Sequence, residues 1–256
     1  MGLLNALLAG RSYGCEVVRL LAFGMVFTAE MVFVTPRCEA ADLWGGSLGI
    51  TSDYFVRGIS RTQDQAALQL DLHYLNDSGF VAGLFASNTE IEPGEPRDVE
   101  LDAFAGFAWT AGSDWHGKIL ASHYAYPWNR AGSAYNYDEL EADAAFQNWL
   151  NVTLTVSPNA PLFVFGRGLI GVTSKTAEVN VQRPLLQKLS ATAGAGYAYF
   201  EGPERAGYAY WSVGASYDLA PVSLTLSYVD TTAGAKTLFY NAAAAGSWSA
   251  TVIWRF

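Results

Sequence analysis

An alternation of apolar and polar side chains with a period of two recurs along most of this chain, in segments of roughly ten residues. In the clearest segment, residues 66–74, the apolar positions are Leu68, Leu70, Leu72 and Tyr74. Successive side chains of a β-strand point to opposite faces, so each segment predicts a strand with one apolar and one polar face. Twelve segments fit this pattern: 43–52, 66–74, 80–87, 99–109, 115–126, 137–146, 149–156, 176–182, 189–199, 207–219, 222–228 and 247–256.

The character of the two faces distinguishes a membrane barrel from a soluble sandwich. The apolar face contains many Ala and Gly residues, which would make a thin core, and the polar face carries acids within the strands. Only 15% of the residues are charged, whereas a soluble domain carries about a quarter. No segment after the leader has about 18 consecutive apolar residues, so no transmembrane helix is expected. The sequence therefore predicts an all-β fold, an antiparallel transmembrane β-barrel of about 12 strands.

The connections between the predicted strands alternate in length. Tight turns follow the second, fourth, sixth, eighth and tenth strands, and longer loops follow the others, as in outer-membrane barrels. The segment 158–174 is ambiguous, because Phe163 to Gly171 could extend a strand, form a loop or add a thirteenth strand. We expect the short turns to face the periplasm.

The amino-terminal residues have the pattern of an export signal. Arg11 and Arg19 precede a mainly apolar run, 20–34, and small residues follow near Ala40. We expect a signal peptide over 1–40 and a barrel domain over 41–256. Both cysteines, Cys15 and Cys38, lie in the leader, so the mature chain would have neither a disulfide nor a thiol nucleophile.

The last strand, 247–256, ends on aromatic residues and is expected to pair with the first strand, 43–52, to close the barrel. Its outer face would carry Trp248, Ala250, Val252, Trp254 and Phe256. Trp254 and Phe256 resemble the carboxy-terminal signal by which the barrel-assembly machinery recognises its substrates. Ile253 is the one large apolar residue on the inner face. Aromatic girdles at the membrane interfaces are expected from Trp109, Trp115, Trp149, Trp211, Trp248 and Trp254.

The inner face is rich in acidic residues. The candidates for lining the lumen are Asp53, Arg57, Asp71, Glu100, Asp102, Lys118, Glu139, Glu141, Asp143, Glu178 and Arg255, with Arg61 as a further base. One interpretation is a water-filled pore that favours cations. The alternative is a structural or surface-interaction barrel whose inner charges pair with one another and with tyrosines. For Arg57, pairing with Asp53 is favoured over lining a constriction.

Other classes of function have little support. The net charge of −9 argues against nucleic acid as a partner, because phosphate binding needs clustered bases. His73, His116 and His123 lack the short spacing of metal ligands, so neither a metal nor another cofactor is expected. An outer-membrane lipase would need a serine activated by histidine. Ser122 and His123 are adjacent and should point to opposite faces, so we predict that the chain is not an enzyme.

A short motif adds a family resemblance. The sequence Thr-Ser-Asp-Tyr-Phe-Val-Arg-Gly-Ile-Ser, residues 51–60, is followed by Ala-Leu-Gln at 67–69 and Ala-Ser-Asn at 86–88. It resembles the opening of a family of uncharacterised, exported proteobacterial proteins that are labelled porins by inference. The resemblance implies an outer-membrane β-barrel that contacts lipid and passes small solutes or ions. It supplies no catalytic residues.

Overall fold

The computed structural model describes residues 18–20, 33–35, 43–91, 98–147, 149–164, 166–203, 205–239 and 243–256. Before residue 43 it contains two short strands, β1 (Val18–Leu20) and β2 (Phe33–Thr35), which pair antiparallel. The rest of the expected signal peptide, including its cleavage point after Ala40, lies outside the described residues.

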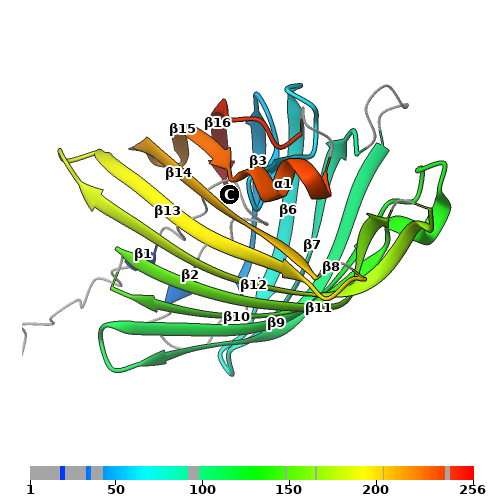
Figure 1. The fold of residues 1–256 in the computed structure, drawn as a ribbon. Helices are drawn as coiled ribbons and strands as arrows, with labels where there is room; N and C mark the ends of the chain where they lie inside the picture. Colours follow the sequence, from blue (N-terminus) through cyan, green and yellow to red (C-terminus); the bar gives the residue numbers. More distant parts are fainter. Residues whose placement is uncertain are drawn as a thin grey trace, which may run out of the picture.

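The described chain from residue 43 onward forms one closed antiparallel barrel of twelve strands (Figure 1). The strands are β3 (Leu43–Thr51), β6 (Ala67–Leu75), β7 (Phe80–Thr89), β8 (Asp98–Ala111), β9 (Trp115–Ala125), β10 (Tyr137–Phe146), β11 (Leu150–Val164), β12 (Gly168–Pro184), β13 (Leu189–Phe200), β14 (Ala206–Leu219), β15 (Val222–Thr231) and β16 (Ser247–Arg255). Closure leaves no unpaired strand edge, which a bilayer requires because lipid offers no hydrogen bonds to a backbone. The predicted strand number and fold class are confirmed.

The first and last strands close the barrel as predicted. Strand β16 pairs with β3 from Thr251 opposite Thr51 to Arg255 opposite Ser47. The backbone of Phe256 continues this pairing, with two hydrogen bonds of 3.0 Å to Gly46. Ile253, the large apolar residue on the inner face of this strand, is buried and lies opposite Gly49.

Tight turns lie at one end of the barrel, which we call the tight-turn rim, at residues 76–79, 112–114, 185–188 and 220–221. In the first turn, the Oδ1 atom of Asn76 accepts hydrogen bonds from Ser78 Oγ and from the backbone of Phe80. Gly79 has a φ of +87°, and a Cβ there would lie 2.2 Å from a backbone oxygen. Only glycine fits this position without strain.

The prediction of a long connection after the seventh strand is wrong. Strands β11 and β12 extend to Val164 and Gly168, so the segment 158–174 forms a hairpin with a short turn and adds no thirteenth strand. Pairing continues past an irregularity between Ser157 and Ala160. The physical reason is that inward side chains of this extension, such as Leu162 and Val172, pack in an apolar cluster with residues of β13 and β14.

The outer surface of the barrel is apolar. Its exposed aliphatic and phenyl side chains include Leu48, Ile50, Leu68, Leu70, Leu72, Leu84, Leu101, Phe107, Ile119, Leu140, Leu154, Val179, Val213, Leu224, Leu226 and Val252. Such an extensive apolar surface is incompatible with water and suits lipid. None of the helices among the described residues is long and apolar enough to cross a membrane.

Aromatic residues mark both ends of this apolar surface. At the tight-turn rim, neighbouring rings pair as Trp44 with Tyr74, Phe80 with Phe107, Trp115 with Phe146, and Trp254 with Phe256. Near the opposite end, which we call the loop rim, Tyr228 contacts both Trp211 and Trp248. Of the six tryptophans expected in girdles, five are exposed, and Trp149 is half-buried beneath the guanidinium of Arg183.

Two connections of the loop rim pack into the barrel. The first, residues 52–66, is called here the inner hairpin and contains β4 (Phe55–Val56) and β5 (Ile59–Ser60). The second contains α1 (Ala233–Leu238), orange in Figure 1, which packs on β14. The two connections meet where the backbone of Ser60 donates a 2.8 Å hydrogen bond to Ala243.

Candidate functional site

The structure turns the predicted lumen residues away from the outer surface. Nine of the eleven side chains are buried: Asp53, Asp71, Glu100, Asp102, Lys118, Glu139, Glu141, Asp143 and Glu178. Arg57 and Arg255 are partly buried, and Arg255 donates a 2.9 Å hydrogen bond to Ser223. The alternation of strands explains this placement, because neighbours along the same strands carry the exposed apolar side chains.

A lysine joins two acids on the inner wall. Lys118 Nζ lies 3.0 Å from a carboxylate oxygen of Glu141 and 3.1 Å from one of Asp143. Register brings these groups together, since Lys118 on β9 is directly opposite Asp143 on β10. Thr153 on β11, the next residue in this row, donates a hydrogen bond to Asp143. These side-chain contacts link the three neighbouring strands β9, β10 and β11 on the inner face.

Two further acids have neutral or weakly basic partners. Glu178 on β12 accepts hydrogen bonds from Asn180 Nδ2 at 2.5 Å and from the hydroxyl of Tyr210 at 2.8 Å. Asp71 on β6 lies 2.6 Å from the ring nitrogen Nδ1 of His73, two residues along the same face. The two contacts lie on opposite sides of the barrel, because β12 and β6 are six strands apart in the closed sheet.

The inner hairpin is held in place by a buried carboxylate near its base. Asp53 Oδ1 accepts hydrogen bonds from Ser60 Oγ at 2.5 Å and Thr62 Oγ1 at 2.8 Å. Thr62 Oγ1 also accepts a 2.9 Å hydrogen bond from the backbone of Tyr54. Burial raises the pKa of Asp53, which lies outside the spanning strands, to about 6, and the two hydroxyl donors only partly offset this effect.

The tip of the inner hairpin crosses the interior to the opposite wall. Arg57 pairs with Glu139 on β10 through both carboxylate oxygens, at 2.7 and 2.8 Å. The expected pairing of Arg57 with Asp53 is therefore wrong. The hairpin turn directs the guanidinium away from its base, where Ser60 and Thr62 both bond the Oδ1 atom of Asp53.

The walls on either side confine this hairpin closely. A Cβ on Gly58 would lie 2.6 Å from Thr231 Cγ2 and 2.7 Å from Tyr210 Cβ, atoms of β15 and β14. Ile59 joins the apolar cluster formed by β11 to β14 and the connection after β15. On the other side, Tyr54 and Val56 pack against Phe85 of β7. The inner hairpin thus contacts the wall in several directions at the level of the loop rim.

Tyrosines surround the acids near the hairpin; the sequence interpretation expected tyrosine partners for the inner charges but named none of these residues. Glu100 accepts hydrogen bonds from the hydroxyls of Tyr54, at 2.8 Å, and of Tyr126. The rings of Tyr124 and Tyr137 stack with centroids 4.3 Å apart. The signal was present in the sequence, because Tyr137 precedes Glu139 by two residues and must share its face.

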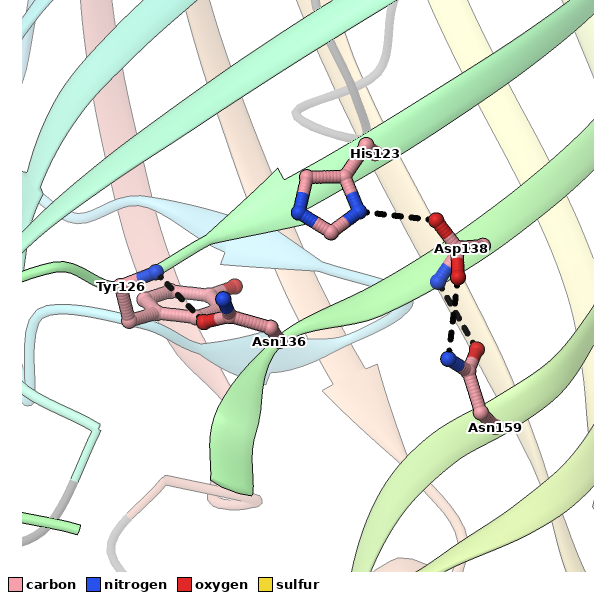
Figure 2. A network of polar contacts seen from close by, with 5 residues as sticks. All are labelled: His123, Tyr126, Asn136, Asp138 and Asn159. Carbon is pink, nitrogen blue, oxygen red and sulfur yellow. Dashed lines mark hydrogen bonds and ion pairs between the residues drawn. The ribbon is translucent and has the colours of Figure 1, made fainter. Parts of the chain in front are cut away.

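The outer face carries a separate polar network near the loop rim (Figure 2). His123 Nδ1 lies 2.8 Å from Asp138, which also accepts a 3.0 Å hydrogen bond from Asn159. His123 is exposed, whereas the adjacent Ser122 lies opposite Glu139 on the inner face, as the alternation predicts. This geometry gives Ser122 no activating histidine. Among the described residues, no group of three or more His, Cys, Asp or Glu side chains could hold a metal ion.

Comparisons with known proteins bear on the fold. The model of a family described as "Bacterial protein of unknown function (Gcw_chp)" matches residues 41–255, and no curated protein matches the sequence. The NanC porin is similar with a TM-score of 0.53 and 9% identity, over 82% of this chain and 98% of that chain. The KdgM porin is similar with a TM-score of 0.50 and 12% identity, over 83% of this chain and 99% of that chain.

An outer membrane channel from Pseudomonas putida F1 is also similar, with a TM-score of 0.51 and 12% identity over 87% of this chain and 99% of that chain. At these low identities the structural similarity shows a shared fold alone, which is that of outer-membrane porins. Together with the apolar belt and its aromatic borders, this fold places the barrel in an outer membrane.

Proposed function

We propose that this chain, which belongs to the Gcw_chp family of bacterial proteins of unknown function, is a channel for passive diffusion of small solutes or ions across the outer membrane. The observation that carries the proposal is the wall of buried, charged side chains inside a porin-type barrel. A barrel that served only as a scaffold could fill its interior with apolar side chains at lower desolvation cost. The resemblance of residues 51–60 to proteins labelled porins supports the same function.

The lumen prefers cations. Of the eleven side chains proposed to line it, eight are acidic and three are basic. An excess of one charge on low-dielectric walls concentrates ions of the opposite sign. The tight-turn rim faces the periplasm, and the loop rim faces outward. Trp254 and Phe256 form the recognition signal for the barrel-assembly machinery, after residues 1–40 have directed export and been removed.

A second candidate function is favoured by one specific observation. The inner hairpin reaches from β3 to the wall at β10, β14 and β15, where it narrows the interior at the loop rim. A barrel held in this state would serve as a structural or surface-interaction protein. Conduction then requires the inner hairpin to move, which makes it a gate in the channel hypothesis.

Conductance measurements separate the two functions. The mature chain, refolded and inserted into planar lipid bilayers, is expected to give discrete current steps in KCl. Under a KCl gradient the reversal potential should have the sign of a cation-selective pore. The neutral variant Asp143→Asn should shift that potential towards zero, and Asp138→Asn on the outer face is the matched control. Absence of current steps from a barrel that remains folded and heat-modifiable would refute the channel.

A further inference from the structure

The tip of the inner hairpin is bound to the wall as a ligand would be. Arg57 presents two guanidinium nitrogens to the two oxygens of Glu139, at 2.7 and 2.8 Å. The Nη2–Oε2 contact is a charge-assisted hydrogen bond, and the Nη1–Oε1 contact adds an ion pair on the same carboxylate. The Glu139 side chain is only 2% exposed, so the pair is largely shielded from water.

The surroundings of this pair are those of a cation-binding site. Tyr137 and Tyr210 lie within electrostatic reach of the guanidinium of Arg57. The carboxylates of Glu141 and Glu178 also interact electrostatically with it. Carboxylates and phenol hydroxyls both accept hydrogen bonds from guanidinium and ammonium groups.

The wall carries a further buried carboxyl group near Glu139, within electrostatic range of Arg61 of the inner hairpin. Asp102 is buried within electrostatic range of Glu100 and Glu139. Its Oδ1 atom has no hydrogen-bond partner among the described residues. A buried carboxylate oxygen without a donor is costly, and its persistence in a structure requires a reason. A positively charged group entering from the lumen would supply the missing donor.

The backbone at Arg57 also points to a role for its side chain. Arg57 and Gly58 are the two central residues of the turn between β4 and β5, with φ values of +52° and +78°. Two-residue turns with positive φ at both positions favour Asn, Asp or Gly at the first position. A long side chain with a Cβ is disfavoured there, so the guanidinium compensates for a backbone preference that a smaller residue would satisfy.

We propose that the wall around Glu139, with Tyr137, Tyr210 and Asp102, is a binding site for solutes that carry a guanidinium or amine group. In the state described here, the inner hairpin occupies this site with its own Arg57. A cationic solute competes with Arg57 for Glu139 and releases the hairpin. This inference rests on the proposed channel function, whose substrate class it specifies.

Removal of the tethered guanidinium tests the site by a readout that does not require conduction. Binding of Nα-acetyl-L-arginine amide, called arginine amide below, to the barrel in detergent micelles is measured by titration calorimetry, with Nα-acetylcitrulline amide, called citrulline amide below, as the uncharged analogue. A tethered group competes at millimolar effective concentration, so Arg57→Met should bind arginine amide at least roughly tenfold more tightly than the unmodified chain. Addition of Glu139→Gln should abolish this gain, and citrulline amide should not bind.

The matched control is Arg183→Met, because Arg183 lies on the ring of Trp149 at the opposite rim. This variant should bind arginine amide as the unmodified chain does. Failure of folded Arg57→Met to bind arginine amide more tightly, or equal binding of citrulline amide, would overturn the site while leaving channel conductance intact. Binding by a variant that gives no current steps would instead refute the channel and retain the site.

A second measurement covers the case in which Arg57→Met does not fold. In bilayers containing the unmodified chain, arginine amide should increase the fraction of time that the channel is open, and Glu139→Gln should remove that response. If the channel conducts KCl normally but arginine amide leaves its open fraction unchanged, the proposal is contradicted.

Discussion

The ion pair between Arg57 and Glu139 is expected to set the balance between the closed and open positions of the inner hairpin. The variant Glu139→Gln keeps the size of the side chain and one carbonyl acceptor, but it removes the charge and one of the two contacts at 2.7 and 2.8 Å. In the closed position Arg57 would then be partly buried without a counter-charge. In the released position it would be hydrated, so the substitution acts mainly on the closed state.

The magnitude follows from the burial of the pair. A hydrogen bond to a charged group contributes about 1.5–3 kcal/mol, and removal of one partner of a buried ion pair costs about 3–5 kcal/mol. Because the Arg57 side chain is 13% exposed and the Gln side chain keeps one acceptor, we expect the closed state to lose about 2 kcal/mol of stabilisation. At about 1.4 kcal/mol per factor of ten, the ratio of open to closed times should rise on the order of thirtyfold.

Single-channel recording of open and closed dwell times measures this ratio directly. The matched control is Glu201→Gln, whose partner Lys175 is exposed, and an exposed pair contributes at most about 1 kcal/mol to stability. Since both side chains of that pair are exposed, whereas Glu139 is buried, its loss should leave the dwell-time ratio unchanged. A ratio for Glu139→Gln within about threefold of the unmodified chain would refute the reasoning, as would an equal response to Glu201→Gln.

Three further predictions concern the hairpin and barrel closure. Because burial raises the pKa of Asp53 to about 6, the closed state binds its proton more readily than the released state does. Acidification from about pH 7 to 5 should therefore lower the open fraction, and Asp53→Asn should flatten this dependence; a rise on acidification would contradict it. Gly58→Val places a Cβ against Tyr210 and Thr231 at a φ of +78°, which should destabilise the closed position by about 1–3 kcal/mol. Faster trypsin cleavage after Arg57 would report this opening, and cleavage at the unmodified rate would argue against it. Deletion of Phe256 removes the two backbone hydrogen bonds to Gly46 and the proposed assembly signal. The yield of heat-modifiable barrel in outer membranes should fall several-fold, whereas an undiminished yield would remove the signal from consideration.

The sequence alone predicts much of the barrel, because alternation is a local property. Each strand shows which side chains face lipid, and the final strand shows that its partner must be the first. Ile253 illustrates the limit of this reasoning. Its inward direction follows from its position, but the residue that it faces, Gly49, belongs to a strand some 200 residues earlier and is identified only by the tertiary pairing.

The β11–β12 hairpin shows a second limit. Its sequence permits a strand, a loop or an extension, because Phe163 to Gly171 lacks a clean alternation. What decides among them is the apolar cluster that receives Leu162 and Val172. Packing against β13 and β14 is a tertiary contact, so the length of these strands could not be determined from their own residues.

For the candidate site, too, the sequence determined some features and the tertiary structure decided others. The sequence determined which acids face inward, since period-two alternation fixes the face of each strand residue whatever the rest of the fold does. It also placed Tyr137 beside Glu139. Only the tertiary structure decided that Arg57 meets Glu139, 82 residues away, rather than Asp53, four residues away. The partner of a side chain on a connection depends on the path of that connection across the barrel, and the path is set by the opposite wall.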